Sequence, residues 1–225
     1  VWGVAVADDF TGARPLGMGR TFVGVADDGY SLDWNPAGIA SFQFLTVTGG
    51  FNKFFMGLDN DNIGMGSFSF INQFRDLMGY GISWRTLFSD VYSENQIKLG
   101  LAHRFGWKPT TFFGSHPLCV GVAFRMNSVG YNTNNFVSNP DEPTSINDDP
   151  VFLDGTSKWG FSMDVGMLWR LSSKFVAGFS ASNILQPNLS IQNTEEGKES
   201  MQIRFGASYA YDRNLLIASD LRYFK

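Results

Sequence analysis

The stretch from 159 to 171 alternates strictly between bulky apolar residues and residues that are mostly small or polar. The bulky positions are Trp159, Phe161, Met163, Val165, Met167, Trp169 and Leu171. The positions between them are Gly160, Ser162, Asp164, Gly166, Leu168 and Arg170. A period of two residues predicts an extended strand with one bulky apolar face and one face that is small or polar.

The same pattern recurs along the chain and predicts about nine strands. Their expected ranges are 42–55, 63–71, 78–87, 94–105, 117–130, 158–171, 174–184, 200–211 and 214–224. Opposite the bulky face stand glycine, serine and a few charges, whereas a soluble strand turns lysine, glutamate and threonine toward water. Bulky side chains outside and small or polar ones inside are typical of an antiparallel transmembrane β-barrel, in which lipid covers the apolar face. A soluble β-sandwich is the alternative, and the small-residue face argues against it.

The connections between the expected strands fall into two kinds. Residues 171–174 and 211–214 form tight turns, whereas 131–157 and 186–199 are long and polar. In an antiparallel order both long links lie at one end of the sheet and both tight turns at the other. Outer-membrane barrels have this asymmetry, with short periplasmic turns and long extracellular loops.

Composition supports a membrane β-protein. Charged residues make up 17% of the 225 positions and aromatic residues 16%, against roughly 25% charged residues in ordinary soluble domains. The chain has no apolar run of 18 residues, which excludes a transmembrane helix. A net charge of −4 and a pI near 5.1 disfavour a nucleic-acid partner. The single cysteine, Cys119, excludes an intrachain disulfide and a multi-cysteine metal site.

The two ends of the sequence carry an expectation about the natural chain. A start at Val1, without methionine, suggests a mature or trimmed chain. An odd number of strands leaves an unpaired edge, and the sequence ends at Lys225 instead of a terminal aromatic residue. We therefore expect either that further strands follow Lys225 in the natural protein or that the number of strands differs from nine.

Residues 1–40 show neither alternation nor helical periodicity. Their distinctive positions are Gly17, Met18, Gly19, Asp27, Asp28, Trp34, Asn35, Pro36, Ala37 and Gly38. Gly17 and Gly19 permit backbone geometry and close approach that a Cβ would block. The Asn35–Pro36 step predicts a rigid turn. We expect 1–40 to form a hatch or plug and 41–225 to form the barrel, with Asp27 and Asp28 capping backbone N–H groups or pairing with arginines of the wall.

Residues 12–40 resemble the FadL-like outer-membrane family, which comprises long-chain fatty-acid transporters and their PorV-like relatives. Members carry similar glycine-methionine-glycine, alanine-aspartate-aspartate and asparagine-proline-alanine runs before the first strand. Trp34 before the Asn35–Gly38 run is closer to the PorV-like branch, whereas Arg20 stands where many relatives have a second glycine. The resemblance implies a barrel of about 14 strands in the outer membrane of a Gram-negative bacterium, with a hatch inside it.

Two functions follow from this resemblance. The main expectation is passive uptake of hydrophobic small molecules such as fatty acids, with membrane lipids as neighbours and without cofactor, metal or catalysis. The alternative is a PorV-like shuttle or partner protein of type IX secretion, or a scaffold of a larger outer-membrane complex. Phe136, Val137 and Phe152 in the polar link 131–157 indicate a surface for such a protein partner.

Four arginines on the small-residue faces are candidate functional groups: Arg104, Arg125, Arg170 and Arg204. One interpretation is a network that ties the hatch to the wall, because buried charges require partners. The other is bidentate binding of a ligand carboxylate.

Three further signals are weak. Gly17–Gly19 lacks the third glycine and the βαβ unit of a dinucleotide fingerprint. The run from Asp59 lacks the ligand spacing of a calcium loop and has Phe70 at its twelfth position. His103 and His116 are the two histidines, and no G-x-S-x-G motif accompanies them, so we expect no hydrolase.

Overall fold

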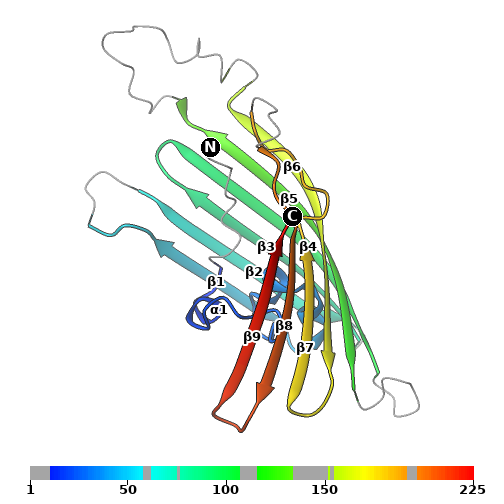
Figure 1. Ribbon diagram of the computed structural model, residues 1–225. Helices are drawn as coiled ribbons and strands as arrows, with labels where there is room; N and C mark the ends of the chain where they lie inside the picture. Colours follow the sequence, from blue (N-terminus) through cyan, green and yellow to red (C-terminus); the bar gives the residue numbers. More distant parts are fainter. Residues whose placement is uncertain are drawn as a thin grey trace, which may run out of the picture.

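The computed structural model describes residues 11–57, 62–74, 77–106, 116–133, 152, 155–191 and 197–225. Nine antiparallel strands form one sheet in which each strand pairs with its neighbours in chain order (Figure 1). The strands are β1 (Thr46–Lys53), β2 (Gly64–Phe74), β3 (Met78–Phe88), β4 (Tyr92–Phe105), β5 (Leu118–Tyr131), β6 (Ser157–Arg170), β7 (Phe175–Ser182), β8 (Gln202–Ala210) and β9 (Leu216–Phe224). Each predicted strand is confirmed, with bounds that differ by a few residues, and so is the all-β, barrel-like fold class. Among the described residues, no helix is long and apolar enough to cross a membrane.

The two ends of the sheet differ in their links, and we name them accordingly. At the loop end lie the strand ends that 132–156 and 183–201 connect, and at the turn end lie those that 171–174 and 211–215 connect (Figure 1). This arrangement confirms the predicted placement of the four links. Of the remaining links, 54–63 and 75–77 follow this division, whereas the short link 89–91 joins strands at the loop end and the longer link 106–117 joins strands at the turn end.

The alternation along the strands separates the two faces of the sheet. Phe161 is 65% exposed on the outer face, whereas its neighbour Ser162 is 3% exposed on the inner face. The same contrast holds along other strands, where exposed apolar side chains include Trp84, Leu99, Leu101, Phe124, Phe205, Leu221 and Tyr223. The apolar face therefore points away from the molecule, as the sequence pattern predicts for a barrel wall.

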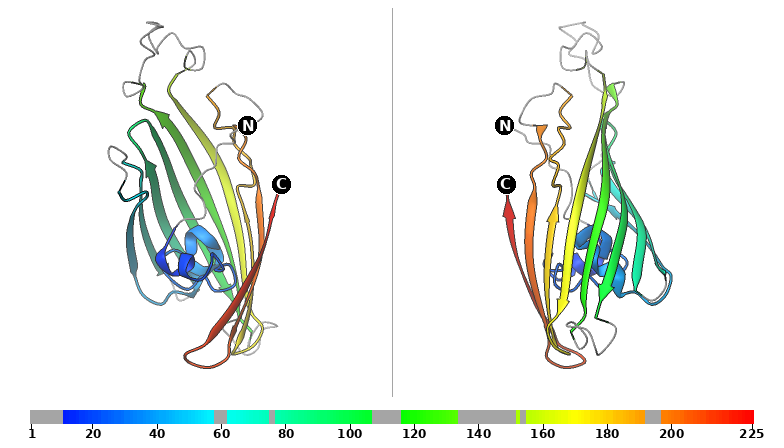
Figure 2. Two further views of the ribbon diagram at one scale, coloured as in Figure 1. Left: turned by 60° about the vertical axis from the view of Figure 1, so that its left-hand side comes forward. Right: turned by 90° about the vertical axis from the view of Figure 1, so that its right-hand side faces the viewer.

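The inner face curves around residues 11–41, which we call the inner segment (Figure 2). It contains three short helices, α1 (Ala13–Gly17), α2 (Ser31–Trp34) and the 3-10 helix η1 (Pro36–Ser41). Its apolar side chains make most of the buried core: Phe22, Ala26, Leu32, Trp34, Ala37, Ile39 and Ala40. Ile71, Ala102, Cys119, Ala123 and Leu168 complete this core from the wall. The protein thus has its core between the inner segment and the concave face.

A row of small residues lets the inner segment lie directly on the wall. Gly79, Ala102, Gly121 and Gly166 are successive cross-strand partners from β3 to β6. A Cβ on Gly121 would lie 2.5 Å from the carbonyl oxygen of Pro36, and one on Gly79 would lie 2.2 Å from the carbonyl oxygen of Ile39. These glycines are needed because backbone meets backbone, with no room for a side chain.

Candidate functional site

The interface between the inner segment and the wall is the candidate functional site, and its first component is a set of backbone anchors. Oδ2 of Asp220, in β9, accepts hydrogen bonds from the backbone N–H groups of Phe22 and Val23 at 2.8 and 2.9 Å. The hydroxyl of Ser208, in β8, donates to the carbonyl oxygen of Gly24 at 2.8 Å. Strands at the end of the chain therefore hold residues near its beginning.

Asn35 forms the second anchor. Its Nδ2 donates to the carbonyl oxygens of Val23 at 2.9 Å and of Met167, in β6, at 3.1 Å. Its Oδ1 accepts the N–H of Ala37 at 3.2 Å, so Asn35 caps the η1 helix that begins at Pro36. The predicted rigid turn takes this form: the backbone of Asn35 is extended, and proline occupies the first helical position, where its missing N–H costs nothing.

A buried cluster of charges lies at the centre of the concave face. Oδ2 of Asp164, in β6, is 3.1 Å from Nζ of Lys98 and 2.8 Å from a terminal nitrogen of Arg125. Lys98 also lies 3.8 Å from Oδ1 of Asp33, which belongs to α2 and accepts a hydrogen bond from the Ser83 hydroxyl at 2.9 Å. Each of the four charged side chains is at most 5% exposed. Two cations and two carboxylates compensate one another, which is what charges removed from water require.

Asp27 and Asp28 are anchored within the inner segment. Both carboxylates pair with the guanidinium of Arg14, and Oδ1 of Asp28 also accepts the N–H of Tyr30 at 2.9 Å. Asp28 therefore caps the backbone, as predicted. The arginine that pairs with Asp27 and Asp28 is Arg14 of the inner segment, whereas the sequence predicted an arginine of the wall. Burial raises the pKa of the Asp28 carboxyl, although the Tyr30 N–H and Arg14 oppose this shift.

The glycines of the motif differ in their roles. The Cβ position of Gly17 and that of Gly19 have nothing within 4 Å, so close approach explains neither of them. Gly19 has a φ of +65°, which glycine adopts without strain, while nothing in the structure requires glycine at Gly17. Gly38 is the position where close approach applies, because a Cβ there would lie 2.2 Å from the carbonyl oxygen of Ala26. Met18 packs at the edge of the core.

Trp34 lies deep in the interface. Its indole Nε1 donates to the carbonyl oxygen of Thr11 at 3.1 Å, and its ring meets Phe22 edge-on with centroids 6.2 Å apart. The guanidinium of Arg204, in β8, stands 5.2 Å from the Trp34 ring centre, within cation–π range. Ala37, beside it in sequence, is fully buried. A tryptophan here closes the space between α2 and the wall.

The four candidate arginines fall into two pairs. Arg125 and Arg204 are 2% and 5% exposed, and their guanidinium groups contact Asp164 and Trp34. Arg104 and Arg170 instead line a cavity of about 220 Å³ at the turn end, together with the inner segment. Asp164, an acidic partner of Arg125, is thus in the neighbouring strand, whereas Asp27 and Asp28 pair with Arg14.

Residues 183–191 and 197–201, between β7 and β8, fold back onto the concave face, which their polar composition did not reveal. Leu189 and Ile191 are buried, and a Cβ on Gly160 would lie 2.7 Å from Leu189. Both carboxylate oxygens of Glu199 accept hydrogen bonds from Nδ2 of Asn127, at 2.9 and 2.8 Å. Leu189 and Ile191, which are apolar residues within a polar stretch, were the signal from which this packing could have been predicted.

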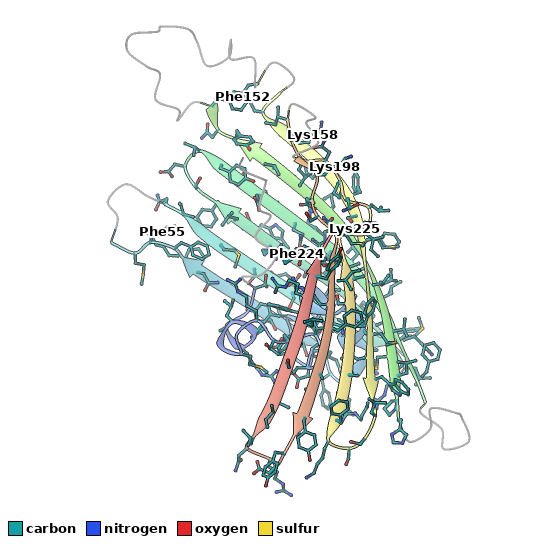
Figure 3. All side chains as sticks on the ribbon, in the orientation of Figure 1. Phe55, Phe152, Lys158, Lys198, Phe224 and Lys225 are labelled. Carbon is teal, nitrogen blue, oxygen red and sulfur yellow. The ribbon has the colours of Figure 1, made fainter. Side chains whose placement is uncertain are left out.

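Phe152 is the described member of the predicted partner surface, since Phe136 and Val137 lie outside the described residues. Its ring lies 5.8 Å from that of Tyr131, which in turn is 5.1 Å from Tyr92. Figure 3 places Phe152 at the loop end, above Lys158. Within the part of the chain that the structure describes, no three potential metal-ligating side chains gather together.

Comparison with known families now adds to this geometry. The sequence model of a family described as type IX secretion system membrane protein PorP/SprF matches residues 32–224. A search of curated proteins finds no match. The matched residues run from α2 through β9, and they confirm the predicted bacterial outer-membrane localisation. Of the two functions expected, the match favours type IX secretion over uptake of fatty acids, and the FadL-like resemblance rested mainly on residues that precede the matched range.

Proposed function

The chain belongs to the PorP/SprF family of type IX secretion system membrane proteins, and from this premise we propose that it acts as an outer-membrane scaffold of that system. In this role it holds other proteins of the secretion system at the membrane. The observation that carries the proposal is the family match, which extends over all nine described strands.

The proposal gives the inner segment the role of a fixed plug. Backbone anchors from β6, β8 and β9, the Asp33–Lys98 contact and the cluster around Trp34 hold it at points along its length. Passive uptake of a ligand would require many of these buried contacts to open together. A scaffold needs no such opening, and a fixed plug keeps the outer membrane sealed.

The proposed orientation follows from the two faces and the two ends. The outer face, with side chains such as Phe124 and Phe161, contacts acyl chains. The turn end faces the periplasm and the loop end faces the cell exterior, as short turns and long loops do in outer-membrane barrels. The aromatic group of Tyr92, Tyr131 and Phe152 is then available to a partner outside the cell.

Secretion in a bacterium that uses the type IX system tests the function. Deletion of the gene should abolish export of a type IX cargo enzyme, and a plasmid copy should restore it. Normal export in the deletion strain, together with reduced uptake of a fatty acid, would show that the main expectation from the sequence was right and the scaffold proposal wrong.

The native cysteine permits a test of the fixed plug. The Ser41 hydroxyl, at the end of η1, lies 3.8 Å from the sulfur of Cys119 in β5, so Ser41→Cys should form a disulfide across the interface on oxidation. A fixed plug predicts equal cargo export with the bridge oxidised or reduced. A variant in an exposed turn, Ser172→Cys, controls for the oxidant. Export that stops on oxidation of S41C and returns on reduction would mean either that the plug must move or that the bridge obstructs a partner contact beside Ser41, and binding of the partner to the oxidised protein distinguishes the two.

A further inference from the structure

We propose that the cavity at the turn end, which we call the arginine cavity, binds a side-chain carboxylate from an acidic segment of a periplasmic partner protein. Its polar lining consists of Arg104, Arg170, Asp27, Ser41 and Gln43, and its volume is about 220 Å³. The inference rests on the proposed function, since it assigns a contact site to one of the partners that a scaffold requires.

The strand register places both arginines on the concave side of the wall. Arg104 is the cross-strand partner of Cys119, which in turn pairs with Leu168, and both of these face the buried core. Arg170 lies two residues beyond Leu168 on the same face of β6, at the last residue of the strand. The cavity therefore lies between the ends of the strands and the inner segment.

The cavity is open to water and closed to lipid. Asp27, Ser41, Gln43 and Arg170 are exposed, so the opening lies at the turn end. The sheet itself separates the cavity from the outer apolar face. A lipid headgroup would have to enter without its acyl chains, whereas the tip of a protein side chain can enter from the aqueous side.

The charges favour an anion. Among the described residues that line the cavity are two guanidinium groups and one carboxylate, that of Asp27, which pairs with Arg14. A guanidinium presents parallel N–H donors that match the two oxygens of a carboxylate or of a phosphate. The enclosure on the concave side favours the carboxylate of a protein over the phosphate of a lipid.

The other two candidate arginines do not offer this chemistry. The guanidinium of Arg125 is directed at Asp164, and that of Arg204 at Trp34, with a terminal nitrogen that donates to Gln202 at 2.5 Å. Both side chains are almost fully buried, so a ligand from solvent cannot reach them. Arg104 and Arg170, in contrast, line a cavity that opens to solvent.

Calorimetry on the full chain in detergent micelles tests the proposal, with acetyl-triglutamate amide as the probe. The double variant Arg104→Gln, Arg170→Gln should bind the peptide at least about tenfold more weakly, because charge-assisted hydrogen bonds are lost. Arg213→Gln, in the exposed turn at the same end, is the matched control and should bind as the unmodified protein does. Heat-modifiable migration on gels checks that each variant is folded.

Two further arms identify the ligand class. Inorganic phosphate and dihexanoyl phosphatidic acid should compete poorly, and preference for either of them over the peptide would overturn the assignment to a protein carboxylate. Peptide binding that is equal in the double variant and in R213Q would overturn the site itself. If the double variant loses the peptide but cargo export is unchanged, the contact exists without a role in secretion, and the scaffold proposal is then tested by the gene deletion alone.

Discussion

Gly121→Ala is the sharpest test of how tightly the inner segment is seated. An ideal Cβ at Gly121 lies 2.5 Å from the carbonyl carbon and oxygen of Pro36 and 2.6 Å from the nitrogen of Ala37. All three atoms belong to the backbone of η1, so no flexible side chain can turn aside. Ordinary contact begins near 3.4 Å, which means that η1 and β5 must separate by 3.4 − 2.5 = 0.9 Å.

The magnitude follows from two opposing effects. Alanine is favoured over glycine within a strand by roughly 0.5–1 kcal/mol, whereas a methyl group forced into a packed interface costs about 1–3 kcal/mol. Gly49→Ala isolates the first effect, because a Cβ there has only the carbonyl oxygen of Ser67 nearby, at 3.9 Å. The free energy of unfolding of G121A should therefore lie about 1–3 kcal/mol below that of G49A.

Urea unfolding from lipid vesicles, followed by tryptophan fluorescence, measures this difference. Gly166→Ala extends the test, because its Cβ would press on the side chain of Asn35 and on Pro36 in the same turn. Since one displacement of η1 relieves both clashes, G121A and G166A together should cost less than the sum of the single variants. If G121A and G49A unfold with equal free energies, the inner segment is not held against the wall and the fixed plug is refuted.

Three other measurements test separate parts of the description. Asp164→Asn should lower the free energy of unfolding by about 3–5 kcal/mol, because Lys98 and Arg125 lose a buried counter-charge. Asp27→Asn, at a half-exposed pair, should change it by about 0–1 kcal/mol. Equal effects of the two variants would contradict the assigned burial. Phe124→Arg, at the middle of β5 on the outer face, should lower the free energy of unfolding in vesicles by about 2–4 kcal/mol. Ser172→Arg, in the turn, should leave it nearly unchanged. An equally small effect of F124R would mean that this face does not contact lipid. Because burial raises the pKa of Asp28 in the folded protein, its contribution to stability is present at low pH and falls as pH rises through the folded pKa. Asp28→Asn should flatten that part of the stability profile, and an unchanged profile would contradict the shift.

The strands could be predicted because the alternation that identifies each strand lies within its own sequence. A residue on the outer face needs to be bulky and apolar, and its neighbour on the inner face needs to be small or polar, so the period of two is visible without knowledge of the fold. Phe161 and Ser162 show this contrast within one strand. The ends of strands carry no such signal, which is why the expected bounds differ from those observed by a few residues.

The interior contacts could not be predicted in the same way. Asp220 accepts N–H groups of Phe22 and Val23 that lie almost 200 positions earlier, and no local pattern connects such residues. The sequence predicted close approach at Gly17 and Gly19. The glycines at which backbone approaches closely lie mainly on the wall. There they cannot be distinguished from the other small residues of an alternating strand. These contacts depend on residues that are far apart in the sequence and on the shape of the surface that each residue meets, and neither is visible in a local sequence pattern.

The buried charge cluster joins the wall to the inner segment. Within the wall, Lys98 and Arg125 share the carboxylate of Asp164, and Asp33 supplies the second negative charge from α2. Removal of the inner segment would take Asp33 away from Lys98 and open the charge cluster to water. It would also expose the wall glycines and the apolar core to water. A deletion of residues 1–40 therefore yields a damaged wall instead of an open pore, and a bridged S41C variant is the sounder way to ask whether the segment must move.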